Sequence, residues 1–285
     1  MSLEKSEREL RRDIVEVCRR IYAHGWIAAS DGNVSLLMPD GRILATPTGV
    51  HKGYLGEGDL IVVDRAGKKL SGTREPSSEL LMHLAAYDER PDVRGVVHAH
   101  PTNCIAFSIA GVSLAQCLLP EIVFTFGAIP TTAYTTPTTD EVPREVRKWL
   151  RDFDAMILDR HGSLTVGADV YAAYDKLERM EHVAEITFRA RQLGPIRPLS
   201  PDQIARLQDV GRSLGLPARK VELSPCDRCN ACPGSGGATL ASHPTSTPTS
   251  TSTPTSTPTP TPTALPADAV IARVHAEVAR ALLRK

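Results

Sequence analysis

Two histidines in the segment VVHAHP, His98 and His100, have the spacing that most clearly indicates chemistry in this chain. On a β-strand, residues two apart point to the same side, so both imidazoles are expected to project together. A third histidine, His161, stands before a glycine in the segment DRHGSL, between two expected strands. Three histidines with an open fourth position are typical of a catalytic zinc site. The pair alone is equally compatible with a chance spacing on an exposed strand.

An acidic residue, Glu79, follows Ser77 and Ser78 at the start of an expected helix. The free N–H groups and the dipole of a helix N-terminus, with two hydroxyls beside them, make an anion site. Two turn segments, 32–33 and 46–49, could supply further N–H groups to the same anion. Each feature by itself is equally an ordinary cap or turn.

The secondary structure that must position these residues is predicted from hydrophobic spacing and turn signals. Helices are expected at residues 4–24, 79–89, from about 102, 139–151, 169–193 and 200–214. Strands are expected at residues 33–38, 42–46, 59–64, 68–70, 93–100, 122–126, 129–134, 155–159 and 163–167. This mixture predicts an α/β or α+β fold in which a sheet packs between helices.

Charge and composition exclude several classes of protein. The 285 residues carry 33 basic and 33 acidic side chains, which argues against a nucleic-acid binder. No apolar run approaches the roughly 20 residues that span a bilayer, and the N-terminus is charged from Glu4, unlike a secretory signal. We therefore expect a soluble cytoplasmic protein with neither nucleic-acid nor membrane partners.

The C-terminal quarter differs in composition from the rest of the chain. Seven of the 22 prolines fall between residues 244 and 266. The expected parts are a globular domain at 1–218, a Cys-rich segment at 219–233, a disordered Thr/Ser/Pro linker at 234–266 and an amphipathic helix at 267–285. One stripe of that helix is apolar: Val270, Ile271, Val274, Val278, Ala281 and Leu282. A single helix of this length is marginal alone and should need a partner surface.

Three cysteines, Cys226, Cys229 and Cys232, are spaced three apart before a proline. This spacing resembles the iron–sulfur run of bacterial ferredoxins, although the fourth cysteine is missing. The three thiolates could instead bind a second zinc ion with another ligand such as His243, or share a cluster with another protein. An exposed Cys-rich hinge without metal is the alternative.

The motifs together carry a specific resemblance. The ordered set DGN, TPTG, EPSSE, HAHP, a tyrosine before a Thr-rich turn, and HG before a strand resembles the class II aldolase/epimerase family, over about residues 5–215. The resemblance implies a central, mainly antiparallel sheet flanked by helices, and a zinc-dependent domain at residues 1–218. It also implies one Zn²⁺ per subunit and a homotetramer with its sites at subunit interfaces.

Roles at individual positions follow from the resemblance. His98, His100 and His161 correspond to the zinc-binding histidines. Glu79 corresponds to the acid beside the zinc, which belongs to the metal site and acts as general base or acid. Tyr134 corresponds to a tyrosine that a neighbouring subunit lends as proton donor. The phosphate-binding residues would be Gly32, Asn33, Thr48, Gly49, Ser77 and Ser78. Arg160 departs from the family, which often has a histidine there, and this should alter the surroundings of the zinc rather than its binding.

The reaction that the resemblance implies is retro-aldol cleavage of a phosphorylated sugar, L-fuculose 1-phosphate or L-rhamnulose 1-phosphate. Its products would be dihydroxyacetone phosphate and L-lactaldehyde, with the metal as the Lewis acid. Two other reactions use the same scaffold. Pentulose-phosphate 4-epimerases have Asp where this chain has Glu79, whereas methylthioribulose-phosphate dehydratases keep the Glu and perform elimination. A non-catalytic scaffold is the third alternative.

The linker followed by a helix at 267–285 resembles encapsulation peptides, which direct enzymes into bacterial microcompartments. This resemblance implies docking on a shell protein and a location in the microcompartment lumen, with helix-in-groove recognition as the mechanism. The alternatives are a helix that packs back on its own tetramer and a helix that lies on a membrane surface.

Overall fold

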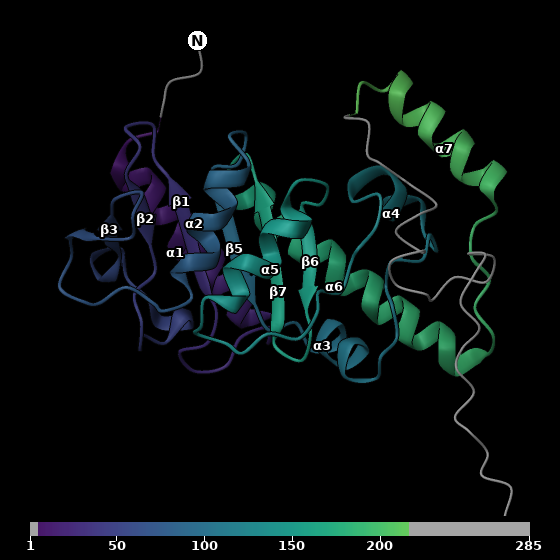
Figure 1. Ribbon diagram of the computed structural model, residues 1–285, viewed down its shortest axis with the longest axis horizontal. Helices are drawn as coiled ribbons and strands as arrows, with labels where there is room; N and C mark the ends of the chain where they lie inside the picture. Colours follow the sequence, from purple (N-terminus) through teal and green to yellow (C-terminus); the bar gives the residue numbers. More distant parts are fainter. Residues whose placement is uncertain (1–4, 217–285) are drawn as a thin grey trace, which may run out of the picture. The chain divides into compact units, whose positions relative to one another are not determined.

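A seven-stranded sheet forms the centre of the computed structural model, which describes residues 5–216 (Figure 1). The strand order is β4-β3-β2-β1-β5-β7-β6, and every pairing is antiparallel. The strands are β1 (Asn33–Leu37), β2 (Ile43–Ala45), β3 (Ile61–Val63), β4 (Lys69–Ser71), β5 (Gly95–Ala99), β6 (Ala155–Leu158) and β7 (Gly162–Gly167). The expected mainly antiparallel sheet with flanking helices is therefore confirmed.

Helices lie on both faces of the sheet (Figure 1). They are α1 (Glu7–Ala23), α2 (Leu80–Glu89), α3 (Thr102–Ile109), α4 (Pro120–Thr125), α5 (Glu141–Leu150), α6 (Val170–Leu193) and α7 (Pro201–Ser213), with short 3₁₀ helices η1 (Lys52–Tyr54) and η2 (Glu57–Asp59). Alternate strand residues separate two cores, as the strand period of two requires. Val97 packs with α1, α3 and α6 in one core, while Val96 packs with α2 and α5 in the other.

Two strands predicted between residues 122 and 134 are wrong. Residues 120–125 form α4, which has Pro120 in its first turn and buries Ile122 and Val123. A short apolar run does not distinguish a strand from a buried helix turn, and proline favours the first turn of a helix. Residues 129–134 lie in a loop that joins β6 through an isolated parallel bridge between Thr131 and Ile157.

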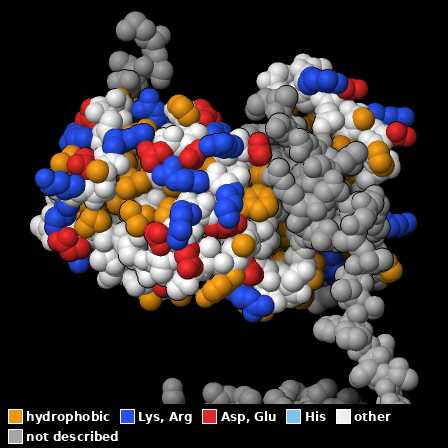
Figure 2. All heavy atoms as spheres, in the orientation of Figure 1, with side chains coloured by type: hydrophobic (Ala, Val, Ile, Leu, Met, Phe, Trp, Pro, Cys, Tyr) orange, Lys and Arg blue, Asp and Glu red, His pale blue; other side chains and the backbone are white. Residues whose placement is uncertain are grey.

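Acidic and basic side chains are interspersed on the surface. On the face in Figure 2, Lys and Arg side chains alternate with Asp and Glu, and the described part of this face carries no extended basic patch. Between α5 and α2, for example, Arg147 forms ion pairs of 3.0 Å with both Asp88 and Glu89. No helix in residues 5–216 has the length and apolar character needed to cross a bilayer. The Cys-rich segment, the linker and the expected C-terminal helix lie outside the described residues.

The register of the three central strands brings distant motifs to one end of the sheet. Asn33, the first residue of β1, pairs with His98 of β5, and His98 also pairs with Leu164 of β7. The chain leaves β5 at Ala99, so His100 follows directly at this end. The turn that joins β6 to β7 lies here as well and carries His161. The fold therefore gathers the DGN, HAHP and HG motifs in one place.

Candidate metal centre

Three histidines converge at this end of the sheet, as the sequence predicts. One ring nitrogen from each of His98, His100 and His161 lies within 4.8 Å of the others. The two Nε2 atoms of His98 and His100 are 3.2 Å apart. Gly162 permits this approach, because a Cβ there would lie 2.5 Å from the Ala99 carbonyl oxygen and 2.8 Å from the His100 ring. The glycine of the HG motif is thus a steric requirement of the cluster.

The turn before Gly162 sets the position of His161. Arg160 adopts a left-handed backbone, with a φ of 56°, which is uncommon for a residue with a side chain. Its backbone N–H donates to the Ser108 hydroxyl of α3 at 3.0 Å, which holds the turn. The Arg160 side chain itself is 58% exposed. Arg160 therefore positions His161 through its backbone.

Hydrogen bonding fixes the orientation of His98. Its side chain is buried, and Nδ1 lies 2.8 Å from the Ser163 carbonyl oxygen. Because a carbonyl only accepts, Nδ1 carries the proton and Nε2 keeps a free lone pair toward the cluster. Burial lowers the pKa of His98 to about 3, and burial also lowers the pKa of His100. Both rings are therefore neutral, the form that binds a metal ion.

Glu79 lies beside the histidines at the N-terminus of α2. Its Oε1 is 3.0 Å from Nε2 of His161, and its Oε2 is 3.6 Å from Nε2 of His98. Burial alone would raise the pKa of Glu79, but the hydrogen bond with His161, the nearby histidines and the Asn33 amide together lower that pKa to about 2. Glu79 is therefore a carboxylate at neutral pH.

The donor set fits a divalent metal ion. Imidazole nitrogens and a carboxylate are the ligands that zinc accepts, and three histidines leave a coordination position open for a substrate. Among the described residues, Nδ1 of His161 is buried without a hydrogen-bond partner, so the protein does not satisfy every ring nitrogen of the cluster. Three converging imidazoles beside an ionised carboxylate make the group fit a divalent cation.

The predicted anion-binding loops are joined beside Glu79. The Thr48 N–H donates to the Glu75 carbonyl at 3.0 Å, so the TPTG segment lies against the EPSSE segment. The Glu79 N–H donates to the Ser77 hydroxyl oxygen at 3.2 Å. At Gly32, φ is +66° and a Cβ would lie 2.8 Å from the His98 carbonyl oxygen, which explains the glycine of DGN. Binding of a phosphate by these loops stays a prediction.

Lys52 joins these loops and was not predicted from the sequence. Lys52 is only 2% exposed, and its ammonium donates to the carbonyls of Ser30 at 2.8 Å, Val50 at 2.9 Å and Pro47 at 3.5 Å. Burial lowers the pKa of Lys52, because the charged form is desolvated. Lysine in a turn-rich segment usually faces water, so the sequence carries no signal for this anchor.

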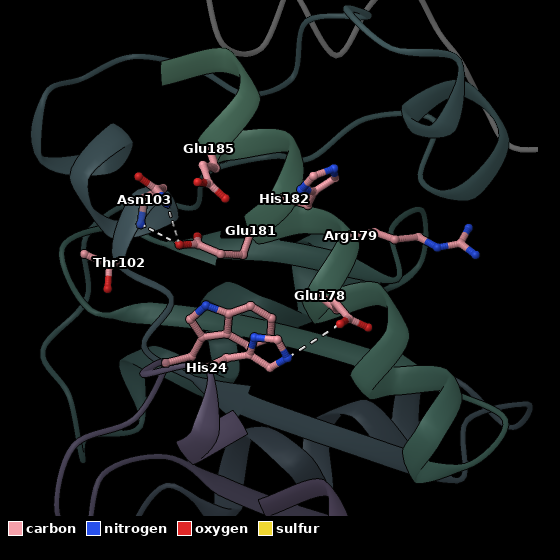
Figure 3. Close-up of a pocket in the computed structure, with 9 residues that line it drawn as sticks. His24, Thr102, Asn103, Glu178, Arg179, Glu181, His182 and Glu185 are labelled. Atoms are coloured by element: carbon pink, nitrogen blue, oxygen red, sulfur yellow. Dashed lines mark hydrogen bonds and ion pairs between the residues drawn. The ribbon is translucent and has the colours of Figure 1, made fainter. Parts of the chain in front are cut away.

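Glu181 of α6 is a second buried charged residue that was not predicted from the sequence, and it fixes the chain directly after His100. Its carboxylate is buried and accepts the N–H of Asn103 at 2.8 Å and the N–H of Cys104 at 3.0 Å, which caps α3 (Figure 3). The His100 N–H donates to the Trp26 carbonyl at 2.7 Å. Both contacts hold the end of β5 in place.

Tyr134, the predicted proton donor, lies in the loop between α4 and α5. It is 60% exposed in the single chain. Its role at a neighbouring subunit's site stays a prediction.

Comparisons with known proteins agree with the site. Residues 12–188 match the family described as Class II Aldolase and Adducin N-terminal domain. The chain is 33% identical over 208 residues to the 3-oxo-tetronate 4-phosphate decarboxylase of Escherichia coli K12, covering 72% of this chain and 97% of that protein. It is 36% identical over 175 residues to the L-fuculose phosphate aldolase of Methanococcus vannielii, covering 61% of this chain and 93% of that protein.

A solved structure is similar as well. The crystal structure of YgbL from Escherichia coli matches with a TM-score of 0.66 and 33% identity, covering 71% of this chain and 99% of that chain. The family match spans more than half of the chain and includes all three histidines and Glu79. The chain therefore belongs to the class II aldolase and adducin family, as one of its metal-dependent enzymes.

Proposed function

We propose that this protein is a zinc-dependent aldolase that cleaves a ketose 1-phosphate, L-fuculose 1-phosphate or L-rhamnulose 1-phosphate, into dihydroxyacetone phosphate and L-lactaldehyde. The observation that carries the proposal is the convergence of His98, His100 and His161 with an ionised Glu79 at 3.0 Å from His161. The similarity to an L-fuculose phosphate aldolase supports the choice of substrate.

The chemistry divides between the metal and the protein. A zinc ion held by the three histidines supplies the Lewis acid that stabilises negative charge when the bond between C3 and C4 breaks. Glu79 handles the proton at C3: in condensation its carboxylate removes that proton, and in cleavage the protonated acid returns it. Its low pKa, about 2, keeps Glu79 ionised, which is the form that accepts the proton in condensation.

Two further parts of the site complete the proposal. The joined loops at 32–33, 48–49 and 77–78 would hold the phosphate through backbone N–H groups and the two serine hydroxyls. Tyr134 from a neighbouring subunit would donate the proton to the aldehyde oxygen in condensation and, as the phenolate, take the proton of the C4 hydroxyl in cleavage. The assembly would be a homotetramer with its sites between subunits.

A second candidate is the decarboxylation of 3-oxo-tetronate 4-phosphate. The relative with that activity from Escherichia coli K12 is similar over 208 residues, whereas the aldolase of Methanococcus vannielii is similar over 175. The two reactions are closely related, because loss of C1 as carbon dioxide from a 3-oxo acid leaves the same three-carbon fragment, dihydroxyacetone phosphate. They differ in the leaving group, since carbon dioxide carries away no hydroxyl proton. Tyr134 should matter only for the aldolase.

The products decide between the two reactions. Zinc-loaded full-length protein would be given L-fuculose 1-phosphate, L-rhamnulose 1-phosphate and 3-oxo-tetronate 4-phosphate in separate reactions, with dihydroxyacetone phosphate, lactaldehyde and carbon dioxide measured. The proposal predicts dihydroxyacetone phosphate and lactaldehyde in equal amounts from one of the ketose phosphates. Carbon dioxide from the oxo acid, with no cleavage of either ketose, would establish the decarboxylase instead.

We also propose that residues 267–285 direct the enzyme into a bacterial microcompartment by docking on a shell protein. The apolar stripe from Val270 to Leu282 and the Thr/Ser/Pro segment before it support this proposal. Deletion of residues 264–285 should abolish co-purification with shells while turnover per active site stays unchanged. Undiminished co-purification would contradict it.

The cysteine cluster is proposed as a second metal site, for zinc or an iron–sulfur cluster, held by Cys226, Cys229 and Cys232. Metal analysis of the full chain against a 1–220 truncation checks this. A metal content that is equal in both proteins would contradict it.

A further inference from the structure

A chain of buried hydrogen bonds runs from Glu79 into the core between α2 and β1. The Asn33 amide nitrogen donates to Oε2 of Glu79 at 2.8 Å, and Oδ1 of Asn33 contacts Nε2 of His83. Nδ1 of His83 lies 2.7 Å from the Ser35 hydroxyl, which lies 2.7 Å from the Tyr87 hydroxyl. Asn33, Ser35, His83 and Tyr87 are each at most 5% exposed.

The residue periodicities of helix α2 and strand β1 create this polar stripe. Glu79, His83 and Tyr87 are four apart, so they lie along one face of α2. Asn33 and Ser35 are two apart, so both face the same side of β1. That side belongs to the core formed by α2 and α5, which is otherwise apolar. Apolar side chains alone could fill this core, so packing does not explain why four polar side chains are buried in it.

The direction of each hydrogen bond follows from the first one. A carboxylate only accepts, so the Asn33 NH₂ faces Glu79 and its carbonyl oxygen faces His83. Nε2 of His83 must then donate, and in the neutral ring Nδ1 must accept. The Ser35 hydroxyl donates to Nδ1, and the Tyr87 hydroxyl donates to Ser35. Burial lowers the pKa of His83 to about 4, which agrees with a neutral ring.

We propose that His83 is a positioning residue for the metal centre: its Nε2–H locks the Asn33 amide so that the NH₂ group, not the oxygen, faces the Glu79 carboxylate. Without this donor the amide can rotate by half a turn, which would place an oxygen against the carboxylate and push Glu79 away from His98 and His161. This proposal depends on the proposed function in one respect, namely that Glu79 transfers a proton during the reaction.

The first test is independent of any substrate. In protein labelled with ¹⁵N-histidine, His83 should show the tautomer protonated at Nε2 and unprotonated at Nδ1 at pH 7, assigned by the loss of that signal in His83→Leu. A tautomer protonated at Nδ1 would overturn the proposal. If no sugar phosphate is cleaved, the proposed function fails and this measurement still stands.

The second test uses whichever sugar phosphate the enzyme cleaves. His83→Leu keeps the volume but removes the donor, and it should lower kcat roughly 30-fold while KM changes less than about threefold and the metal content stays at the wild-type value. His83→Gln, whose amide can donate to Asn33, should recover most of kcat. Tyr87→Phe, at the far end of the stripe, should cost less than about threefold.

Folding is controlled by circular dichroism and gel filtration of each variant. A His83→Leu enzyme with kcat within twofold of wild type would overturn the proposal. A loss of activity that is fully explained by a loss of bound metal would also overturn the proposal. The same holds if folded His83→Gln is no more active than folded His83→Leu, because either result means that His83 has only a structural role.

Discussion

At the scale of single residues, burial decides the protonation states at the site. His98 is held neutral because its ring is buried, while the hydrogen bond to the Ser163 carbonyl fixes which ring nitrogen carries the proton. Glu79 is held ionised because hydrogen bonds from His161 and Asn33 outweigh the effect of its burial. A neutral ligand beside a charged base is the arrangement that a metal-assisted proton transfer requires.

Replacing the carboxylate tests its part in the reaction. Glu79→Gln keeps the shape but removes the base, so kcat should fall at least roughly 100-fold. Bound metal should persist, because the three histidines are unchanged. Turnover and metal content per chain are the measurements. A kcat within threefold of wild type would remove Glu79 from the mechanism.

His83 also makes the stability of the metal-free protein depend on pH. Its pKa falls from an ordinary 6.5 to about 4 on folding, so below pH 6.5 the unfolded chain binds a proton that the folded chain does not. The stabilising contribution is complete above pH 6.5 and is lost as the pH falls to about 4, by about 1.4 kcal/mol per pH unit. The slope of unfolding free energy against pH should be smaller in His83→Leu, measured by urea denaturation. Equal slopes between pH 4 and 6.5 would contradict this.

The sequence predicts the histidines and Glu79 well, because ligand spacing on a strand and the order of motifs are local signals. Asn33 is predicted as a phosphate ligand, and the structure shows its amide bonded to Glu79. Lys52 and Glu181 are missed, because a buried charge is recognisable only when its distant acceptors or donors are known.

At the scale of elements, most helices and strands were predictable from their periodicity, whereas the short apolar run after Pro120 was not. The 24 residues of α6 and the strands β5 and β7 lie close to their expected positions. The six-residue α4 was predicted as a strand, since its buried Ile122 and Val123 suit either structure.

Lys52 provides a test at this scale, because it ties the loop at Ser30 to the loop at residues 47–50. Lys52→Met should destabilise the protein by about 2 kcal/mol through three unpaired carbonyls. It should also raise KM for the sugar phosphate roughly tenfold, with a smaller effect on kcat. Urea denaturation and steady-state kinetics measure both. Lys68→Met, at an exposed position, is the matched control and should change neither. An unaltered KM in a folded Lys52→Met enzyme would contradict the account.

At the scale of the whole molecule, the central question is whether one chain is a complete enzyme. Tyr134 is 60% exposed in the single chain, as a residue lent to another subunit would be. Co-expression of His98→Ala and Tyr134→Phe chains tests this. In a mixed tetramer, about a quarter of the sites would combine an intact metal centre with a neighbour's tyrosine. Recovery to about that fraction of wild-type activity is expected, whereas no recovery would place the tyrosine in its own subunit's site or outside catalysis.

The central claim is that the three-histidine centre cleaves a carbon–carbon bond only with its metal bound. The most direct measurement is the rate of dihydroxyacetone phosphate formation from L-fuculose or L-rhamnulose 1-phosphate by metal-stripped protein titrated with zinc. We expect no turnover without metal, full activity near one zinc per histidine centre, and no activation of His98→Ala at any zinc concentration. Turnover by stripped protein, or zinc activation of His98→Ala equal to wild type, would contradict it.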